Sequence, residues 1–461
     1  MSTAEVLRRM DAILETATVE RFEAGLRGTL LRPGMTAYEE ARRVHNAMID
    51  KRPALIARCA GVADVVRAVN FARENALLVA VRGGGHNVAG LAVCDGGIVI
   101  DLSGMKGIRV DPASQTVRAE GGVTWGELDH ETQAFGLGTT GGAVSTTGIA
   151  GLTLGGGLGA LMRKHGLACD NVLSIDVVTA DGLVLTASAT ENVDLFWALR
   201  GGGGNFGIAT TFEYRLHPVG TVLGGLVLYP IDRARDMLAF YRDFTATAPD
   251  ELTAYAALLT SPAGVPVAAI FVCYAGPLAT GETLLRPIRE FGPPMADLIS
   301  PMPYAAIQRT FDSTAPSGHL NYWKSTFAQE LAPEVTDELV AAYAIVPSSL
   351  SSVVIEHLGG AVGRVNEGDT AFSHRRMPYS ITAASLWRQA SQSEKNIAWT
   401  RRLWDAIRAP TSDAVYANYL SEGEQRTSAA YGSNYERLVA VKNRYDPTNL
   451  FRVNQNIKPT V

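Results

Sequence analysis

Apolar residues in the first hundred positions alternate between strand-like and helix-like spacing. Short apolar runs at residues 54–59, 77–82 and 97–102 predict buried strands. Between the first two runs, segment 61–76 places its apolar residues three and four positions apart, which predicts an amphipathic helix. This order of elements is typical of a small α/β unit.

A second unit is predicted from about residue 106 to residue 216. Its strands are short and rich in β-branched residues, and they flank turn signals such as Asp181-Gly182. The predicted strands are 107–111, 116–120, 172–180 and 183–188, and the predicted helices are about 125–134 and 192–199. We therefore expect residues 1–216 to form one domain with subdomains of about 1–105 and 106–216.

The pattern changes after His217-Pro218. Apolar strands then alternate with amphipathic helices such as 233–248, which predicts an antiparallel sheet backed by helices in a domain of residues 217–412. The predicted strands are 223–231, 252–261, 267–276, 351–360 and 379–387. Segment 413–461 is rich in Asn and Tyr, and we expect it to return to the first domain.

Composition excludes several classes of partner. The chain has 461 residues, 47% of them hydrophobic, with a formal net charge of −5 and no basic stripe, so neither nucleic acid nor a membrane surface is an expected partner. No apolar run approaches the roughly 18 residues of a membrane span. The charged N-terminal 22 residues do not read as a signal peptide, and a cytoplasmic location is expected. The four cysteines lack CxxC spacing, so we expect no metal site and no disulfide framework.

Four glycine tracts lie in the first half, at 83–85, 141–142, 155–157 and 201–204. No P-loop pattern occurs, and the GxGxxG/A matches beginning at Gly155 and Gly202 lack the strand and helix that a dinucleotide fingerprint needs. Any one tract alone would be a tight turn. Together they predict an extended ligand whose pyrophosphate lies on backbone N–H groups.

Five motifs in this order resemble the berberine bridge enzyme-like flavoproteins, which have a vanillyl-alcohol oxidase-type (PCMH-type) FAD-binding fold. The motifs are VRGGGHN (81–87), GGIVIDL (96–102), segment 139–171, DLFWALRGGGGNFGI (194–208) and YDPTNLFRVNQNIKP (445–459). Within the family the chain looks most like the bacterial members that include 6-hydroxy-D-nicotine oxidase. The resemblance implies an α+β fold in which a two-part FAD-binding domain joins a substrate domain.

The resemblance also implies FAD bound through a single 8α-N-histidyl bond from His86. Val144 stands where many relatives have a cysteine that forms a second bond, and Leu152 replaces a histidine of some relatives. Thr147 occupies the gatekeeper position over the flavin and has a volume close to that of valine, which favours access of oxygen. The other expected cofactor-binding residues are Arg82, Gly83, Gly84, Gly85, Asn87, Gly142, Gly148, Gly155, Gly156, Asn171, Gly207, Ile208, Asn454 and Asn456.

The implied reaction takes a hydride from a CH–OH or CH–NH group of a small organic molecule to flavin N5, reducing O2 to H2O2, while a base removes a proton. Tyr379 and Tyr419 match active-site tyrosines of the family, and the family's glutamate position falls near Thr382. Lys324, Glu356 and His357 are further catalytic candidates, and each candidate side chain has a purely structural alternative.

Two alternatives to an oxidase stay open at this point. One is a dehydrogenase of the same fold that passes electrons to a quinone or protein acceptor. The other is a flavin-binding protein without turnover, which the missing glutamate permits. The substrate and the oligomeric state are not defined by the sequence.

Overall fold

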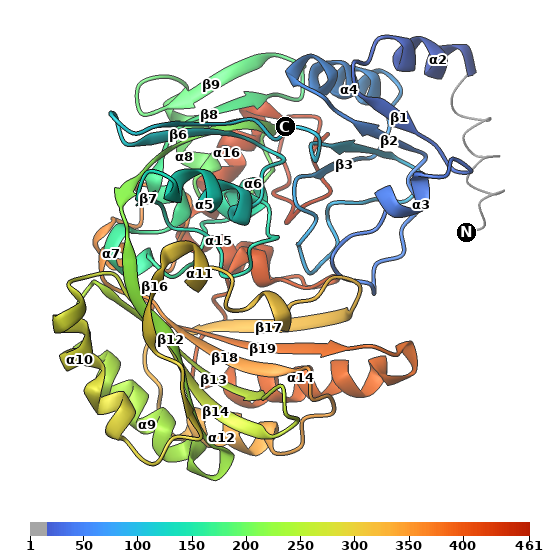
Figure 1. Ribbon diagram of the computed structural model, residues 1–461. Coiled ribbons are helices and arrows are strands. Elements are labelled where there is room, and N and C mark those ends of the chain that lie inside the picture. Colours follow the sequence, from blue (N-terminus) through green and yellow to red (C-terminus); the bar gives the residue numbers. More distant parts are fainter. Residues whose placement is uncertain (1–15) are drawn as a thin grey trace.

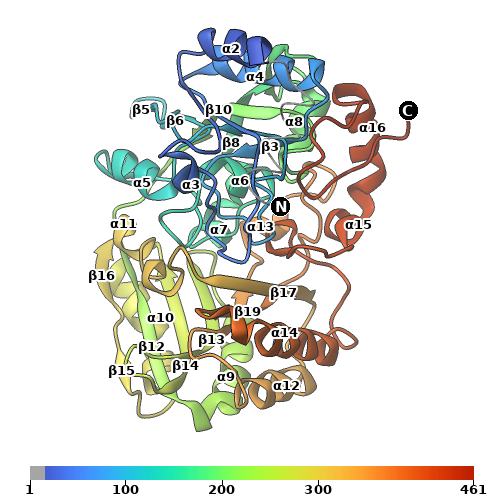
Figure 2. The same ribbon diagram turned by 90° about the vertical axis from the view of Figure 1, so that its right-hand side faces the viewer.

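The computed structural model describes residues 16–461 (Figures 1 and 2). Most of the N-terminal stretch used above to exclude a signal peptide therefore lies outside the described residues. The chain forms two bodies, and Figure 1 shows the first half of the chain above the second.

A small sheet with strand order β1-β2-β4-β3 opens the first half. Strands β2, β4 and β3 are parallel, and β1 is antiparallel to β2. Helices α2 and α4 pack on this sheet, and Phe22 of α2 stacks on Phe71 of α4 with ring centroids 4.1 Å apart. The bounds are α2 Thr16–Ala24, β1 Thr29–Leu31, α3 Tyr38–Ala41, β2 Leu55–Arg58, α4 Val62–Glu74, β3 Val79–Arg82 and β4 Ile98–Asp101.

A five-stranded antiparallel sheet of order β5-β6-β10-β8-β9 completes the first half. The two predicted hairpins are its outer pairs, and β10 joins them by pairing Tyr214 with Val117 and Phe212 with Ile175. Trp125 of α5 and Tyr214 are fully buried in the core below. The bounds are β5 Ile108–Asp111, β6 Thr116–Glu120, α5 Trp125–Gln133, β7 Leu137–Gly138, α6 Ile149–Leu154, α7 Met162–His165, η1 Ala168–Asn171, β8 Val172–Val178, β9 Val184–Ser188, α8 Val193–Leu199 and β10 Ile208–Arg215.

The second half is one large antiparallel sheet of order β15-β12-β14-β13-β18-β19-β17, with β16 also paired to β12. Helices α9, α10, α12 and α14 lie on the face turned away from the first half (Figures 1 and 2). The bounds are β11 His217–Pro218, β12 Thr221–Pro230, η2 Ile231–Arg233, α9 Ala234–Thr245, β13 Leu252–Thr260, β14 Pro266–Tyr274, α10 Leu278–Glu290, β15 Ala296–Asp297, β16 Ser300–Pro303, α11 Tyr304–Ile307, η3 Asp312–Thr314, β17 Leu320–Ala328, α12 Pro333–Tyr343, β18 Ser352–His357, α13 Ala361–Arg364, β19 Tyr379–Trp387, η4 Ala390–Gln392 and α14 Ser393–Ile407. This architecture confirms the predicted α+β class.

The last fifty residues leave the second half and pack on the first (Figure 2, red). Their elements are η5 Ala417–Tyr419, α15 Thr427–Tyr431, η6 Gly432–Asn434 and α16 Tyr435–Tyr445. Lys442 and Asp446 form a fully buried ion pair of 2.6 Å at the end of α16. Lys442 Nζ also donates to the carbonyl of Asn205 in the first half, and Asp446 accepts from the backbone N–H groups of Leu450 and Phe451. The pair therefore fixes the tail against the first half.

Replacing Asp446 by Asn tests this attachment. The substitution leaves the buried Lys442 ammonium without a counter-charge, and we expect the free energy of unfolding in urea to fall by about 3 kcal/mol. Asp405→Asn is the control, because its pair with Arg408 is exposed and 4.0 Å long; it should change stability by less than about 0.5 kcal/mol. Equal effects of the two substitutions would contradict the assigned role of Lys442–Asp446.

Candidate active site

A cavity lies between the two halves of the described chain and has about 1840 Å³ of empty space, which includes open solvent at its mouth. Loops of the first half line one side, namely segments 83–87, 142–155 and 203–209. Tyr255, Trp323 and Glu356 from the large sheet line the other side. The tail contributes segments 416–419 and 451–455. The cavity is therefore lined by residues of the first half, the second half and the tail.

Two glycine loops of the cavity touch backbone to backbone. A Cβ atom on Gly84 would lie 2.7 Å from the Cα of Gly148, and one on Gly148 would lie 2.8 Å from the Cα of Gly84. Since carbon atoms do not approach this closely without overlap, only glycine fits at either position. Gly204 differs, because a Cβ there would meet nothing within 4 Å. Backbone at Gly204 is thus open to a ligand in the cavity.

The His86 imidazole lies in the cavity between side chains of two other segments. Its Nε2 is 2.8 Å from Thr146 Oγ1, and its Nδ1 is 3.4 Å from Thr147 Oγ1. The His45 ring stacks on it with ring centroids 4.1 Å apart. Burial, with a smaller contribution from His45, lowers the pKa of His86 to about 3, so the ring is neutral at physiological pH. A neutral imidazole keeps a lone pair available for bonding.

A hydrogen-bonded acid pair faces the same cavity. Tyr419 donates its hydroxyl proton to Glu356 Oε1 at 3.0 Å, and Glu356 Oε2 has no partner among the described residues. Burial raises the pKa of Glu356 to about 7, although the Tyr419 hydroxyl acts in the opposite sense. The rings of Trp323 and Tyr416 meet Tyr419 edge to face at 5.6 and 4.8 Å. A substrate in this aromatic pocket would meet a carboxyl group that titrates near neutrality.

Comparison with known proteins identifies the chain's relatives. The model of the FAD binding domain matches residues 53–188, and that of the berberine and berberine-like family matches residues 415–458. An FAD-linked oxidoreductase of Dictyostelium discoideum is 35% identical over 449 residues, which cover 96% of this chain and 97% of the relative. The chain belongs to the berberine bridge enzyme-like FAD-linked oxidoreductases.

Two further comparisons place this oxidoreductase within the family. The (R)-6-hydroxynicotine oxidase of Paenarthrobacter nicotinovorans is 31% identical, with 94% of this chain and 97% of the relative aligned. The crystal structure of 6-hydroxy-D-nicotine oxidase from Arthrobacter nicotinovorans superposes with a TM-score of 0.87 at 30% identity, covering 94% of this chain and 98% of that one. These findings confirm the resemblance inferred from the motifs and the assignment of FAD as cofactor.

The residues of the oxidoreductase's cavity fit FAD. Asn454 lines the cavity, and its buried Oδ1 has no hydrogen-bond partner within the described part of the chain, so it is available to a ligand. The open backbone at Gly204 suits close approach of a pyrophosphate, and His86 offers a neutral nitrogen. When bound, FAD would supply a two-electron acceptor in this cavity.

Most of the expected cofactor-binding residues line this cavity. They are Gly83, Gly84, Gly85, His86, Asn87, Gly142, Val144, Thr147, Gly148, Gly155, Gly207, Ile208 and Asn454. Leu152, noted above as a replacement for histidine, also lines it. No cysteine contributes to the lining of the cavity, and Cys59, Cys94, Cys169 and Cys273 are all buried and free.

Four expected cofactor-binding residues lie outside the cavity. Asn171 caps local structure: its amide donates to the carbonyls of His165 and Leu167, and its Oδ1 accepts from His217 Nε2. Arg82 donates to the carbonyl of Ala41. Gly156 makes room for Phe372, because a Cβ on Gly156 would lie 2.5 Å from the nearest atom of that ring. Asn456 is half-buried in the tail and does not line the cavity.

Three catalytic candidates lie on the face of the large sheet that is turned away from the cavity. Tyr379 faces the helices, where its hydroxyl lies 3.1 Å from Thr245 Oγ1, because side chains along a strand alternate between faces. Lys324 pairs with Glu424 at 2.6 Å and lies over the Trp404 ring, next to the cavity-lining Trp323 but on the opposite face. His357 likewise turns away from the cavity and lies 3.4 Å from Arg163 Nη1. The structure therefore leaves Glu356 and Tyr419 as the candidates that face the cavity.

Several cavity residues carried no clear signal in the sequence. His45, Thr146, Tyr255, Trp323 and Gln455 reach the site only through tertiary contacts. Tyr416 and Asn418 also line the cavity. They lie within three residues of Tyr419, the predicted catalytic tyrosine, and this closeness in sequence is the only signal that points to them.

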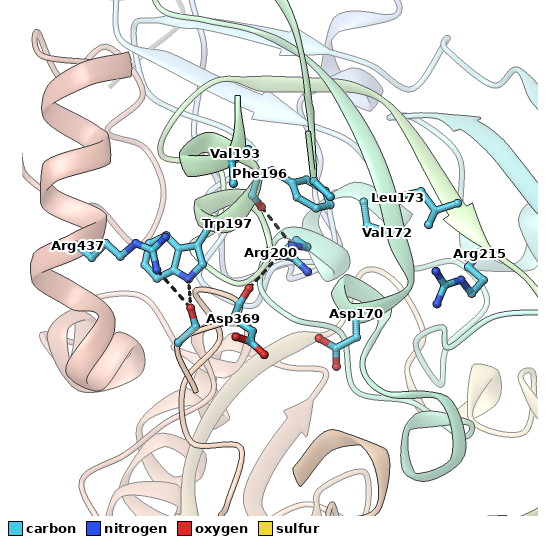
Figure 3. A pocket seen from close by; sticks show the side chains of 12 residues that line it. Asp170, Val172, Leu173, Val193, Phe196, Trp197, Arg200, Arg215, Asp369 and Arg437 are labelled. Atoms are coloured by element: carbon cyan, nitrogen blue, oxygen red, sulfur yellow. Dashed lines mark hydrogen bonds between the residues drawn. The ribbon is translucent and has the colours of Figure 1, made fainter. Parts of the chain in front are cut away.

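A second cavity lies beside α8 (Figure 3). Several of its polar groups are engaged by contacts within the chain: Trp197 Nε1 donates to the Gly368 carbonyl at 2.9 Å, and Arg200 Nη2 donates to the Asp369 carbonyl at 2.9 Å. Arg437 of α16 lies 3.8 Å from the centre of the Trp197 ring. These contacts tie α8 to the loop around residue 368 and to α16, and we assign this cavity a structural role.

Within residues 16–461, no helix is long and apolar enough to cross a membrane. The same part of the chain contains no group of His, Cys, Asp and Glu side chains arranged to hold a metal ion.

Replacing Gly84 by Ala tests the contact between the glycine loops. The added methyl group overlaps the backbone of Gly148, so the loops must separate, and we expect purified protein to lose most of its bound flavin. Gly220→Ala is the matched control, because a Cβ there meets nothing within 4 Å and the residue does not line the cavity. Visible flavin absorbance per polypeptide measures the effect. Full flavin content in Gly84→Ala would contradict the assigned constraint.

Proposed function

We propose that the protein is an FAD-dependent oxidase carrying its flavin on a single bond from His86. In this proposal residues 1–216 and 413–461 hold the flavin and residues 217–412 hold the substrate. The substrate is a small organic molecule that loses a hydride from a CH–OH or CH–NH group, and O2 is reduced to H2O2. The observation that carries the proposal is that the Tyr419–Glu356 pair and the neutral His86 imidazole face the same cavity.

The Tyr419–Glu356 pair supplies the base that such an oxidation needs. As the substrate O–H or N–H proton moves to Tyr419 Oη, the Tyr419 proton moves along its hydrogen bond to Glu356 Oε1. Glu356 must be ionised to accept this proton, and its pKa of about 7 makes that form available near neutrality. Burial raises the pKa of Tyr419 far above its usual value, so the phenol acts as a relay rather than as a preformed phenolate.

Two features support the oxidase assignment over the alternatives. Thr147 lines the cavity with a side chain no larger than valine, which leaves room for oxygen. The relatives named above include an oxidase of 6-hydroxynicotine, and the aromatic pocket of Tyr255, Trp323 and Tyr416 would accommodate a molecule of that size. Val144 supports a single flavin bond, since it offers no sulfur to a second one.

Acid denaturation tests the flavin bond. We expect yellow flavin fluorescence to stay with the precipitated wild-type polypeptide and to wash free from His86→Ala. His130→Ala, an exposed histidine of α5, serves as the control and should retain its flavin. Release of flavin from the wild type would show that His86 forms no bond, and a colourless wild type would refute the cofactor assignment.

The pH dependence of turnover tests the Tyr419–Glu356 pair. With a substrate found by screening for peroxide release, kcat/KM should fall as the pH drops below about 7, because Glu356 becomes protonated and accepts no further proton. Glu356→Gln and Tyr419→Phe should each lower kcat/KM by about 100-fold or more, and Glu356→Gln should abolish the pH dependence. Tyr379→Phe changes a hydroxyl on the other face of the sheet and should preserve the wild-type profile. A larger loss in Tyr379→Phe than in Tyr419→Phe would overturn the assignment of the base.

Stopped-flow measurement of flavin reoxidation distinguishes the acceptors. An oxidase is reoxidised rapidly by air-saturated buffer, whereas a dehydrogenase waits for an added quinone. If no substrate bleaches the flavin at all, the protein is a flavin-binding protein without turnover.

A further inference from the structure

One segment of the second half contacts both segments that flank the His86 ring, the loop that carries Thr146 and the segment that carries His45. Segment 304–321, which we call the strap, runs from the end of β16 into the first two residues of β17 and contains α11 and η3. Ala315 of the strap lines the cavity. The strap also forms hydrogen bonds with two segments of the first half, 142–145 and 45–47, so it joins the two halves at the site.

The strap contacts the loop that carries Thr146 and Thr147. Ser145, the residue before them, donates its backbone N–H to Asp312 Oδ1 at 2.8 Å and its hydroxyl to Asp312 Oδ2 at 2.6 Å. Gln308 donates from Nε2 to the Gly142 carbonyl at 3.3 Å, and it is 1% exposed. Both oxygens of one carboxylate are therefore engaged by a single serine next to the threonines that contact His86.

The strap also contacts the segment that carries His45, on the other side of His86. Gly318 donates its N–H to the His45 carbonyl at 3.2 Å, and the His319 carbonyl accepts from the N–H of Ala47 at 2.9 Å. The Asn46 side chain accepts from the N–H of Asn321 at 2.9 Å and donates to the Asn321 carbonyl at 3.0 Å. His45 is thus held where its ring stacks on His86.

Thr146 is the group whose position matters most to His86. Its hydroxyl is 2.8 Å from Nε2, whereas the hydroxyl of Thr147 is 3.4 Å from Nδ1. The short contact engages Nε2, so Nδ1, which has only the longer contact with Thr147, is the nitrogen more available to bond. A shift of the loop by a few tenths of an ångström would loosen this contact and let the ring rotate.

We propose that Asp312 is a positioning residue for flavin attachment: through Ser145 it holds the Thr146 hydroxyl on Nε2 of His86 and so presents Nδ1 to the flavin. Asp312 touches neither His86 nor the cavity, and it acts only through the loop. This inference rests on the proposed bond between His86 and FAD. It adds that the second half of the chain is needed to prepare the histidine of the first half.

Three variants and one control test Asp312. Asp312→Ala removes both acceptors. Asp312→Asn retains an oxygen that accepts from the Ser145 N–H and gains an amide that donates to Ser145 Oγ. We therefore expect this variant to keep the loop in place and to attach flavin as the wild type does. Ser145→Ala removes only the hydrogen bond from the Ser145 hydroxyl to Asp312 and leaves the one from the Ser145 N–H. It serves as the test variant if Asp312→Ala does not fold. Thr314→Ala is the control, because the Thr314 hydroxyl donates only to the Phe311 carbonyl in the same turn of the strap.

Two measurements are made on the full-length, flavin-loaded protein. The first is the fraction of flavin that survives acid precipitation in samples taken at intervals after expression is induced. We expect flavin attachment to take about ten times longer in Asp312→Ala than in the wild type, which is the effect expected when a hydrogen bond to a charged group is lost. Ser145→Ala should slow attachment less. The second is hydrogen exchange of the backbone amides of residues 143–149, which should be about tenfold faster in Asp312→Ala. Asp312→Asn and Thr314→Ala should match the wild type in both.

The outcomes separate this proposal from the one on which it rests. Wild-type attachment and wild-type exchange in Asp312→Ala would overturn the role of Asp312. A lower melting temperature with an unchanged attachment time would also overturn it, because a purely structural contact gives that result. If acid strips flavin from the wild type while exchange still accelerates in Asp312→Ala, the histidyl bond is refuted and Asp312 remains as the residue that positions the loop.

Discussion

The contact between the backbones of Gly84 and Gly148 is the constraint on which the rest of the site depends. Two loops of the first half cross there with no side chain between them, and a Cβ on either residue would lie within 3 Å of a backbone atom of the other. Because Gly84 precedes His86 by two residues and Gly148 follows Thr146 by two, the crossing brings the imidazole and the threonine hydroxyl together. Gly84 and Gly148 allow the two loops to come into contact, whereas Gly204 leaves its backbone open to a ligand.

The cavity exists only because segments far apart in the chain close around that crossing. The buried Lys442–Asp446 pair holds the tail in place, and the tail brings Tyr419 and Asn454 into the cavity lining. The strap brings Asp312 to Ser145 from the second half. Each of these contacts joins residues more than 150 positions apart or fixes a segment that does so. The two sides of the cavity are therefore parts of one tertiary arrangement.

Strand alternation decides which polar residues of the large sheet face this arrangement. Glu356 and His357 are neighbours on β18, yet Glu356 meets Tyr419 and His357 meets Arg163. Trp323 and Lys324 divide in the same way on β17. The period of two in a strand separates each adjacent pair, and a shift of one residue in register would exchange their roles.

The sequence by itself determined the fold class, the family and the cofactor, because these depend on local signals: the spacing of apolar residues, the glycine tracts and the RGGGHN motif with His86. It named Tyr419 with the same weight as Tyr379, and Glu356 with the same weight as Lys324. Apolar residues fall on both faces of β17 and β19, so their spacing does not show which face meets the cavity. Asn171 was assigned to the cofactor for a similar reason, because a motif does not tell a residue that touches the ligand from one that supports the loop. Only the tertiary structure decided which face each strand presents, placed His45 and Thr146 beside His86, and brought Asp312 to Ser145, because those contacts are set by the packing of distant segments rather than by any local preference.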